Sequence, residues 1–488
     1  MAGGDLPNHR PENGQMSRAV AATGALTCLR TTPNLLGEPC TYTLNRVLLM
    51  TIPVRSGATA LTHCRPAIAF LAMAIPQAIG AQLRVERRVS GDTTIVRTVG
   101  TEPASATRKL QPVLTFGRFD GPPEYVFGRI TGLNTGHDGS IWVFDAQVPA
   151  LRQFDTTGRY IKTIGRGGEG PGEYGSLVSL AFPRDGGAIV LSFPSGGASL
   201  ALQRTHNAIQ TLSASGALVS SFAIPSVPRR RSAGPPISVS SSGTLVVDTA
   251  DALYVSTTVG AMPASAGTPQ SRPIEAMVRY LPNGTARDTI LVPALGLVPV
   301  DFSGTGPYMP RECWAFTRLG HLLVGRTDRY QIHIVTGRDR IVRVERDIPR
   351  IRIGDAERQS LSPASGTYVP PREKPYFSVL RTDHDGRVWV KLHTPSEQVP
   401  ASELAAARAA ATGRGGRAAA QPANRAVFRE SGNIHEVFGP DGRYLGRVDL
   451  PEFNYPPAIR GNTVWMQKAD TAGVPVVVKY RIVPPLPR

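Results

Sequence analysis

The chain has 488 residues and a formal net charge of +17, from 54 basic and 37 acidic residues. Gly 50 and Pro 43 together make up close to a fifth of it, where an average protein has roughly 12%. Because these turn-forming residues are spread along the chain, the composition favours many short strands and excludes a protein built mainly of long helices.

The positive charge does not by itself indicate a nucleic-acid partner. Only six of the basic residues are Lys, and the Arg residues are scattered, mostly alternating with apolar residues in strand-like runs. Arg229–Arg231 is the only block, and no zinc-finger, helix-turn-helix or RNA-binding signature occurs. We expect no nucleic-acid partner. The alternative, binding of an acidic polymer through Arg, would depend steeply on salt.

Residues 1–81 are interpreted as a non-globular extension followed by a signal peptide. The apolar stretch 66–81 is too short to span a bilayer comfortably and ends in small residues before polar sequence. Residues 1–49 show no periodicity, so we expect translation to start at Met50 and cleavage to fall near Ala81–Gln82. The result is an exported chain, periplasmic or extracellular, without a stable membrane span. A membrane-tethering helix is the alternative.

The cysteines predict neither a disulfide nor a metal site in the mature chain. Cys28, Cys40 and Cys64 precede the folded region, which leaves Cys313 alone. No pair has the spacing of metal ligands, so no metal and no cofactor are expected. We expect Cys313, beside Trp314, to be a small buried apolar side chain.

Two segments about fifty residues apart resemble each other. Phe116–Tyr125 contains Phe-Gly-Arg and ends in Glu-Tyr, and Ile164–Tyr174 contains Ile-Gly-Arg and ends in Glu-Tyr. Between them, His137-Asp138-Gly139 predicts a tight turn and Ile141–Asp145 a buried strand. A repeat of this length made of short strands and turns indicates one blade of a β-propeller.

The fold class predicted is all-β, a six-bladed β-propeller over residues 111–484. The expected units are 111–165, 166–225, 226–292, 293–350, 351–452 and 453–484. The last has too few strands for a full blade. The segment 82–110 contains Thr93–Val99, rich in β-branched residues, and we expect this strand to pair with the C-terminal blade and close the ring. The Ala-, Arg- and Gly-rich stretch near 402–421 predicts a surface insertion with a short helix and a mobile loop.

Two of these segments are similar to a known family of repeats. Asp138–Asp145 with Leu151–Gly158 resembles the NHL repeat, and Gly168–Tyr174 resembles the linker of exported bacterial six-bladed propellers with NHL-like repeats. The resemblance implies the fold and export, since most such proteins have no assigned activity. Some six-bladed relatives are lyases or metal-dependent lactonases. Their functional residues have no motif that aligns here, so no catalytic residue is assigned.

Two histidines are candidates for ligand binding. His137 and His384 occupy the same place in two units, each before Asp-Gly, which would make them a pair on one face of the ring. The favoured interpretation is structural, because turns accept Asx and His residues and repetition alone matches their positions. Asp145 and Asp155, at strand ends, are likewise expected to fix turns rather than to bind a cation.

A second set of candidates lies in a glycine-rich crossover. Arg166, Glu169, Glu173 and Tyr174 stand where glycines would let the backbone approach a ligand closely. The favoured alternative is that the glycines make a tight turn and Glu173 pairs with a neighbouring Arg to lock adjacent blades. Trp142 and Trp389 recur in matching strands and predict core packing.

Two functions follow as hypotheses. The first is a non-enzymatic exported propeller, expected to be a monomer, that binds a protein, peptide or glycan through a loop face. The second is a lyase or hydrolase with a site at the mouth of the central channel. Convergence of three or more His, Asp or Glu side chains at that mouth would favour the enzyme.

Overall fold

The structure is a computed structural model. It describes residues 83–168, 170–193, 206–225, 245–262, 272–293, 295, 307–337, 340–362, 368–412, 426–453 and 455–487, all in the unit Pro76–Arg488. The predicted leader with its start at Met50, the Arg229–Arg231 block and Glu169 lie outside the described residues. Within the part described, no helix has the length and apolar character needed to cross a membrane.

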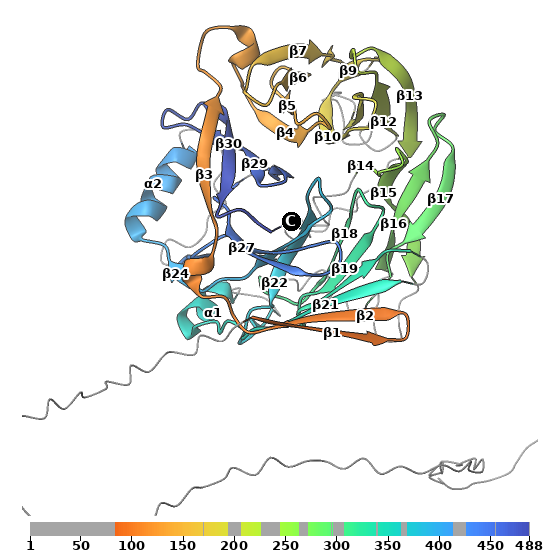
Figure 1. Ribbon diagram of the computed structural model, residues 1–488. Helices are drawn as coiled ribbons and strands as arrows, with labels where there is room; N and C mark the ends of the chain where they lie inside the picture. Colours follow the sequence, from red (N-terminus) through yellow and green to blue (C-terminus); the bar gives the residue numbers. More distant parts are fainter. Residues whose placement is uncertain are drawn as a thin grey trace, which may run out of the picture. The chain divides into compact units, whose positions relative to one another are not determined.

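Six antiparallel arrays of four strands follow one another and stand around a common centre (Figure 1). The chain is therefore a six-bladed β-propeller, as predicted. The strands are as follows, blade by blade.

Blade 1 contains β4 Ile130–Thr135, β5 Ile141–Asp145, β6 Ala150–Phe154 and β7 Tyr160–Ile164. Blade 2 contains β10 Ser176–Ala181, β11 Ala188–Phe193, β12 His206–Leu212 and β13 Leu218–Pro225. Blade 3 contains β14 Leu245–Val247, β15 Leu253–Met262, β16 Arg272–Tyr280 and β17 Ala286–Leu291.

Blade 4 contains β18 Glu312–Phe316, β19 Leu322–Arg326, β20 Gln331–Val335 and β21 Ile341–Asp347. Blade 5 contains β22 Phe377–Thr382, β23 Val388–Leu392, β26 Ile434–Phe438 and β27 Tyr444–Asp449. Blade 6 contains β28 Ala458–Arg460, β29 Thr463–Ala469, β30 Pro475–Val483 and β3 Lys109–Phe116.

The remaining elements lie outside the four-stranded blades. They are β1 Arg84–Ser90, β2 Thr93–Val99, the 3-10 helices η1 Ala104–Ala106 and η2 Pro123–Tyr125, the short strands β8 Arg166–Gly167, β9 Glu173–Tyr174, β24 Ser396–Gln398 and β25 Phe428–Glu430, and the helices α1 Asp355–Leu361 and α2 Ala401–Thr412. Helix α2 confirms the helix predicted at the start of the 402–421 insertion. Residues 413–425 are not described.

Burial falls from the middle of a blade to its outer edge. In blade 1 all five residues of β5 and all five of β6 are buried, whereas β7 is mostly exposed. A strand packed on both faces by neighbouring blades must be apolar on both sides, which explains the continuous run in β5. The Asp-Gly turn before β5 supplies the positive φ it needs, since Gly139 has φ 84°.

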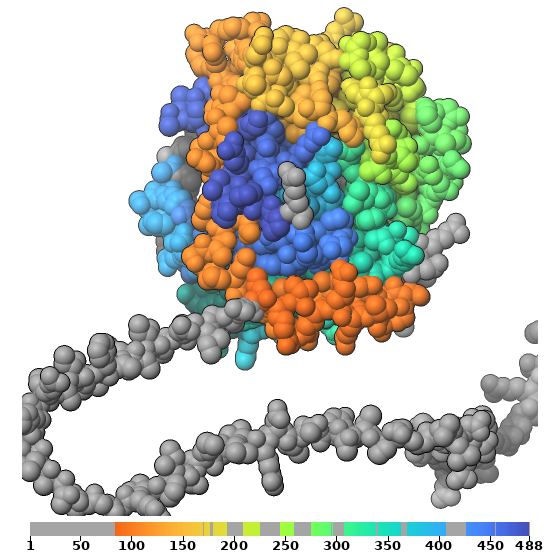
Figure 2. All heavy atoms as spheres, viewed as in Figure 1, coloured from red at the N-terminus to blue at the C-terminus, as the bar shows by residue number. Residues whose placement is uncertain are grey.

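The ring is closed by an N-terminal strand, but not by the one predicted. β3 pairs antiparallel with β30 and completes blade 6, and Figures 1 and 2 show this N-terminal strand, in orange, beside the C-terminal strands, in blue. The assignment of Thr93–Val99 to this role is wrong, because β2 pairs in parallel with β21 on the outside of blade 4. Pro112 lies at a bulge of β3, and an outer strand tolerates a proline because one of its edges needs no N–H donor.

The β1–β2 hairpin extends blade 4 into a six-stranded sheet. A fully buried ion pair holds its inner side: Arg346 Nη2 lies 2.9 Å from Glu436 Oε1, and both side chains are 0% exposed. Arg346 also donates to the carbonyl oxygens of Thr98 and Gly100. One guanidinium therefore joins blade 4, blade 5 and the N-terminal hairpin, with its charge and donors satisfied.

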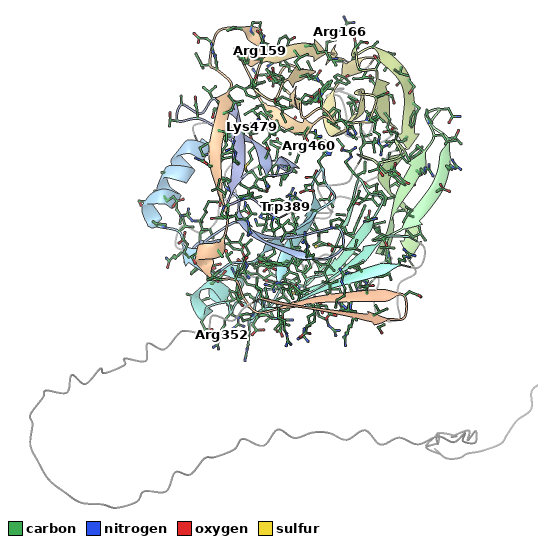
Figure 3. All side chains as sticks on the ribbon, viewed as in Figure 1. Arg159, Arg166, Arg352, Trp389, Arg460 and Lys479 are labelled. Carbon is green, nitrogen blue, oxygen red and sulfur yellow. The ribbon has the colours of Figure 1, made fainter. Side chains whose placement is uncertain are left out.

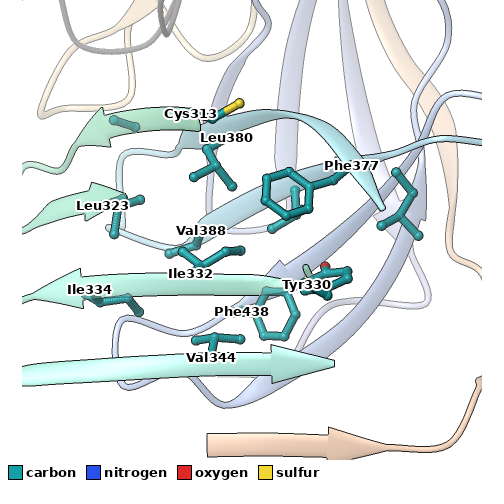
Figure 4. Close-up of a cluster of buried hydrophobic side chains, with 13 residues drawn as sticks. Cys313, Leu323, Tyr330, Ile332, Ile334, Val344, Phe377, Leu380, Val388 and Phe438 are labelled. Atoms are coloured by element: carbon teal, nitrogen blue, oxygen red, sulfur yellow. The ribbon is translucent and has the colours of Figure 1, made fainter. Parts of the chain in front are cut away.

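Apolar side chains fill the spaces between adjacent blades. The cluster in Figure 4 joins blades 4 and 5 through residues such as Ile332, Phe377 and Phe438, all fully buried. Cys313 belongs to it, as predicted, and burial raises the pKa of its thiol to about 12. Trp142 and Trp389 are 2% and 1% exposed and pack between blades, which confirms their predicted core role.

Closure of the ring predicts a large cost for removing Phe116. This side chain of β3 is 8% exposed and lies 4.6 Å from the ring of Phe154 in blade 1, so it connects the last blade to the first. We expect Phe116→Ala to lower the free energy of unfolding by about 3–5 kcal/mol, measured by chemical denaturation. The control is Phe119→Ala, whose side chain is 83% exposed and should change stability by no more than about 0.5 kcal/mol. Equal effects would contradict the role given to β3.

Candidate functional site

The strand directions separate the predicted site residues into two groups on opposite faces of the ring. The first strand of each blade lies innermost, and β4 contacts the first strands of blades 2 and 6. Since β4 runs from Ile130 to Thr135, the turn with His137 lies at one end and the crossover after Ile164, paired with Leu151, lies at the other. His137 and His384 therefore share the turn end, and Arg166, Glu173 and Tyr174 lie at the crossover end.

A tightly bonded turn presents His137 at the turn end. Gly136 N–H donates to Ser140 O, and Gly139 N–H donates to Gly136 O. The carboxylate of Asp138 accepts from Ser140 N–H at 2.9 Å. The backbone is thus fixed on both sides of His137. The half-buried imidazole takes no part in the hydrogen bonds that form the turn.

The same turn recurs in blades 4 and 5. Gly386 N–H donates to Asp383 O in blade 5, and Gly320 N–H donates to Thr317 O in blade 4. The position of His137 is occupied by His384 in blade 5 and by Arg318 in blade 4. Repetition therefore places three polar side chains, each from a different blade, at equivalent points of the ring.

These three side chains meet across the channel. The ring centroids of His137 and His384 lie 5.4 Å apart. Arg318 Nη1 lies 2.5 Å from Nδ1 and 2.8 Å from Nε2 of His384, and its Nη2 lies 2.6 Å from Nε2 of His137. A neutral imidazole offers one acceptor nitrogen, so the guanidinium donates one hydrogen bond to each ring. Blades 1 and 4 are opposite each other in a ring of six, so Arg318 reaches over the channel axis.

The arrangement keeps both imidazoles neutral at physiological pH. Burial, followed by the charges of Arg318 and Arg460, lowers the pKa of His384 to about 4. The same causes lower the pKa of His137. Beneath the turn, burial raises the pKa of Asp383 to about 7, and its carboxylate accepts from Trp389 Nε1–H at 3.0 Å. Two neutral imidazoles thus flank a permanent positive charge.

More charged residues surround this cluster. Arg460 of blade 6 lies toward the centre of the ring (Figure 3) and donates to Gly136 O at 2.8 Å. Asp251 of blade 3 accepts from Arg184 N–H at 2.9 Å, and Asp385 of blade 5 accepts from Gly461 N–H of blade 6 at 2.6 Å. We refer to His137, Arg318, His384 and Arg460 as the channel-end cluster.

The crossover candidates form a structural lock. Arg166 Nε donates to Glu173 Oε1 at 2.9 Å, and the other carboxylate oxygen accepts from Gly170 N–H at 3.0 Å. Arg166, near the periphery in Figure 3, is 81% exposed at its side chain, whereas Tyr174 is fully buried against Phe144. Burial raises the pKa of Tyr174 to about 12. The geometry agrees with the favoured structural interpretation, and any ligand-binding role of Arg166 and Glu173 stays a prediction.

The strand-end aspartates fix turns, as predicted. Asp145 is fully buried and accepts from the backbone N–H groups of Gly128, Arg129 and Gln147. Asp155 accepts in the same way from the backbone N–H groups of Thr157 and Arg159, in the turn before β7. Among the residues that the structure describes, no group of three or more His, Cys, Asp or Glu side chains is placed to hold a metal ion.

Sequence reasoning found the two histidines but missed Arg318 and Arg460. The signal for Arg318 was present, because Arg318-Leu319-Gly320 aligns with His137-Asp138-Gly139 and His384-Asp385-Gly386 once the turns are superposed. Arg460 had no such signal, since the turn of blade 6 is shorter and passes from β28 to β29 through Gly461 and Asn462. Contacts between opposite blades cannot be seen in any single repeat.

Comparison with known families agrees with the fold. Residues 122–195 match the model of a family described as a 6-bladed beta-propeller. The matched segment contains all of blade 1 and the first two strands of blade 2. No match was found among curated proteins.

Several solved structures have a similar chain path. A protein of Bacteroides fragilis described as exported is 10% identical with a TM-score of 0.41, covering 80% of this chain and 99% of its own. A member of a family of unknown function from Bacteroides vulgatus is 10% identical with a TM-score of 0.43, covering 77% and 99%. Virginiamycin B lyase from Staphylococcus aureus is 11% identical with a TM-score of 0.34, covering 77% and 100%. Similarity at this level says nothing about activity, and the fold stands on the strand pairing described above.

The electrostatics of the channel-end cluster predict an unusual titration. We expect His384 to titrate near pH 4, measured by NMR on histidine-labelled protein. Arg318→Gln should raise this pKa, because it removes a nearby positive charge, while burial keeps it below the ordinary value of 6.5. The control is Arg159→Gln, which removes an exposed charge from an outer turn of blade 1. A pKa of His384 that does not respond to Arg318→Gln would contradict the contact.

Proposed function

We propose that this protein is an exported binding module that holds a protein, peptide or glycan ligand at the turn end of its central channel. One observation carries the proposal: Arg318, His137 and His384 come from three blades and contact one another at the turn end of the ring. Binding sites in ring-shaped folds form where loops of several repeats meet, because each blade supplies one group and none can form the site alone.

The state of these side chains supports a binding role. All four members of the channel-end cluster are half-buried, so they keep contact with solvent while their backbones are pinned by turn hydrogen bonds. Groups that are held in place before a ligand arrives lose little freedom on binding. By contrast, the interior of the blades is packed mainly with apolar side chains, and buried charges there, such as Arg346 with Glu436, are paired.

Export is part of the proposal. The signal-peptide layout of residues 66–81 supports it, with a periplasmic or extracellular destination. Four cysteines in the full sequence, of which only Cys313 follows this segment, leave a mature chain that needs no disulfide. We propose no nucleic-acid partner for it and expect it to act as a monomer.

A lyase or hydrolase is the second candidate, and the two imidazoles favour it. A neutral imidazole can accept a proton, and a guanidinium beside it can stabilise a developing negative charge. The channel-end cluster contains both groups within hydrogen-bond distance. An enzyme would turn over a ligand that the wild-type protein binds and would lose turnover, but keep binding, in His384→Gln.

The binding proposal predicts that ligand binding depends on Arg318. We expect the mature protein, applied to glycan and peptide arrays, to bind a defined set of ligands, and Arg318→Ala to lose most of that binding. Arg159→Ala, an exposed arginine away from the channel, should bind as the wild type does. Far-UV circular dichroism would confirm that each variant is folded. Array ligands that bind Arg318→Ala and wild type equally would place the site elsewhere.

A further inference from the structure

Among the residues that the structure describes, no hydrogen bond of the two arginines in the channel-end cluster goes to a carboxylate. The partners of the Arg318 guanidinium are two neutral imidazoles and the carbonyl oxygen of Val247, and Arg460 donates to the carbonyl oxygen of Gly136. None of these partners is an anion. Burial and Arg460 lower the pKa of Arg318 from its ordinary value, yet a guanidinium remains charged in proteins.

The carboxylates nearest the cluster already accept hydrogen bonds from backbone N–H groups. Asp251 accepts from Arg184 N–H, and Asp385 accepts from Gly461 N–H and lies 3.9 Å from Arg387. Both residues are exposed. The buried carboxyl group of Asp383 accepts from Trp389 Nε1–H and from the backbone N–H groups of Asp385 and Arg387. Three arginines, Arg318, Arg460 and Arg184, therefore lie close enough for their charges to repel one another, while the carboxylates named here have other hydrogen-bond partners.

We infer that the channel-end cluster binds an oxyanion, a carboxylate, phosphate or sulfate group of the ligand, with Arg318 as its main contact. This inference rests on the proposed binding function and names the chemical class that the site accepts. The planar N–H donors of a guanidinium match the spacing of the oxygens in such groups. An oxyanion stabilises a half-buried guanidinium most when no carboxylate is already paired with it. The two imidazoles add one N–H donor each, because a neutral ring keeps one protonated nitrogen.

The histidines make the affinity depend on pH. A bound anion favours the protonated imidazoles, so it raises the pKa of His384 and His137 from their lowered values. Between the free and the bound pKa, binding takes up protons, and affinity must then rise as the pH falls. The other charged groups near these rings are Arg318, Arg460, Asp251 and Asp385. The buried carboxyl of Asp383, next to His384, has a pKa raised to about 7 and also titrates in this range. His384→Gln keeps Asp383, so the part of the pH dependence that this variant removes belongs to the imidazole.

Calorimetric titration of the mature protein tests the inference with three probes at constant ionic strength. Sulfate keeps its charge throughout the pH range, trigalacturonate supplies carboxylates on a glycan, and maltotriose is a neutral glycan. We expect sulfate or trigalacturonate to bind with one-to-one stoichiometry, and to bind more tightly at pH 5.5 than at pH 7.5. Arg318→Gln should weaken binding at least about tenfold, because it removes a charge-assisted contact.

Two further variants separate this result from non-specific attraction to a basic protein. Arg159→Gln removes the same charge from an exposed outer turn and should leave affinity unchanged. His384→Gln keeps Arg318 and should reduce the change of affinity with pH; it also decides the matter if Arg318→Gln fails to fold. The inference is overturned if neither anion binds, if maltotriose binds as tightly as trigalacturonate, or if Arg159→Gln weakens binding as much as Arg318→Gln.

Failure of this inference can be told from failure of the proposed function. If neutral array ligands bind and need Arg318, the binding site stands and its anion preference is wrong. If array ligands bind without regard to Arg318, the site itself is wrong, whatever the anions do.

Discussion

The pairing of β3 with β30 is the constraint on which the rest of the structure depends. Five blades are built from consecutive strands, but the sixth is completed only when a strand from the start of the fold joins one from its end. An open array would leave two unpaired sheet edges, and it would leave blade 1 without a neighbour on one side. Closure brings blades 1, 4 and 5 around one axis, and a contact between Arg318 and His137 exists only in a closed ring.

The closed ring is then held at its turn end by polar contacts that pass from blade to blade. Thr249 N–H donates to Arg318 O, His384 N–H donates to Ile459 O, and Arg460 donates to Gly136 O. The first two bonds join the backbones of neighbouring turns, whereas the third is donated by the Arg460 side chain to the backbone of blade 1. The protein therefore combines a rigid scaffold with polar side chains that keep their hydrogen-bonding capacity for a ligand.

The repeated pattern of turns and buried strands was sufficient to predict the six-bladed fold, because each blade repeats the same local chemistry. Thr93–Val99 was assigned to the wrong blade because a β-branched strand fits the outer edge of any sheet, and nothing local says which edge it meets. The sequence pattern did not indicate β3 as the closing strand, because it contains Pro112 and proline is a poor strand former except at a sheet edge. His137 and His384 were found by repetition, whereas the partner that joins them comes from the opposite side of the ring.

Blade 3 shows that the fold does not require charge at this position. Thr249 follows Asp248 in a turn with the same hydrogen bonds, from Asp251 N–H to Asp248 O and from Asp248 N–H to Ala252 O. A neutral side chain is therefore compatible with the turn. Among the described residues, the Arg318 guanidinium has no carboxylate within hydrogen-bond distance. A half-buried cation without such a partner lowers stability relative to a neutral residue. Since Arg318 adds a cost that the turn does not demand, its presence is best explained by a ligand that supplies the missing negative charge.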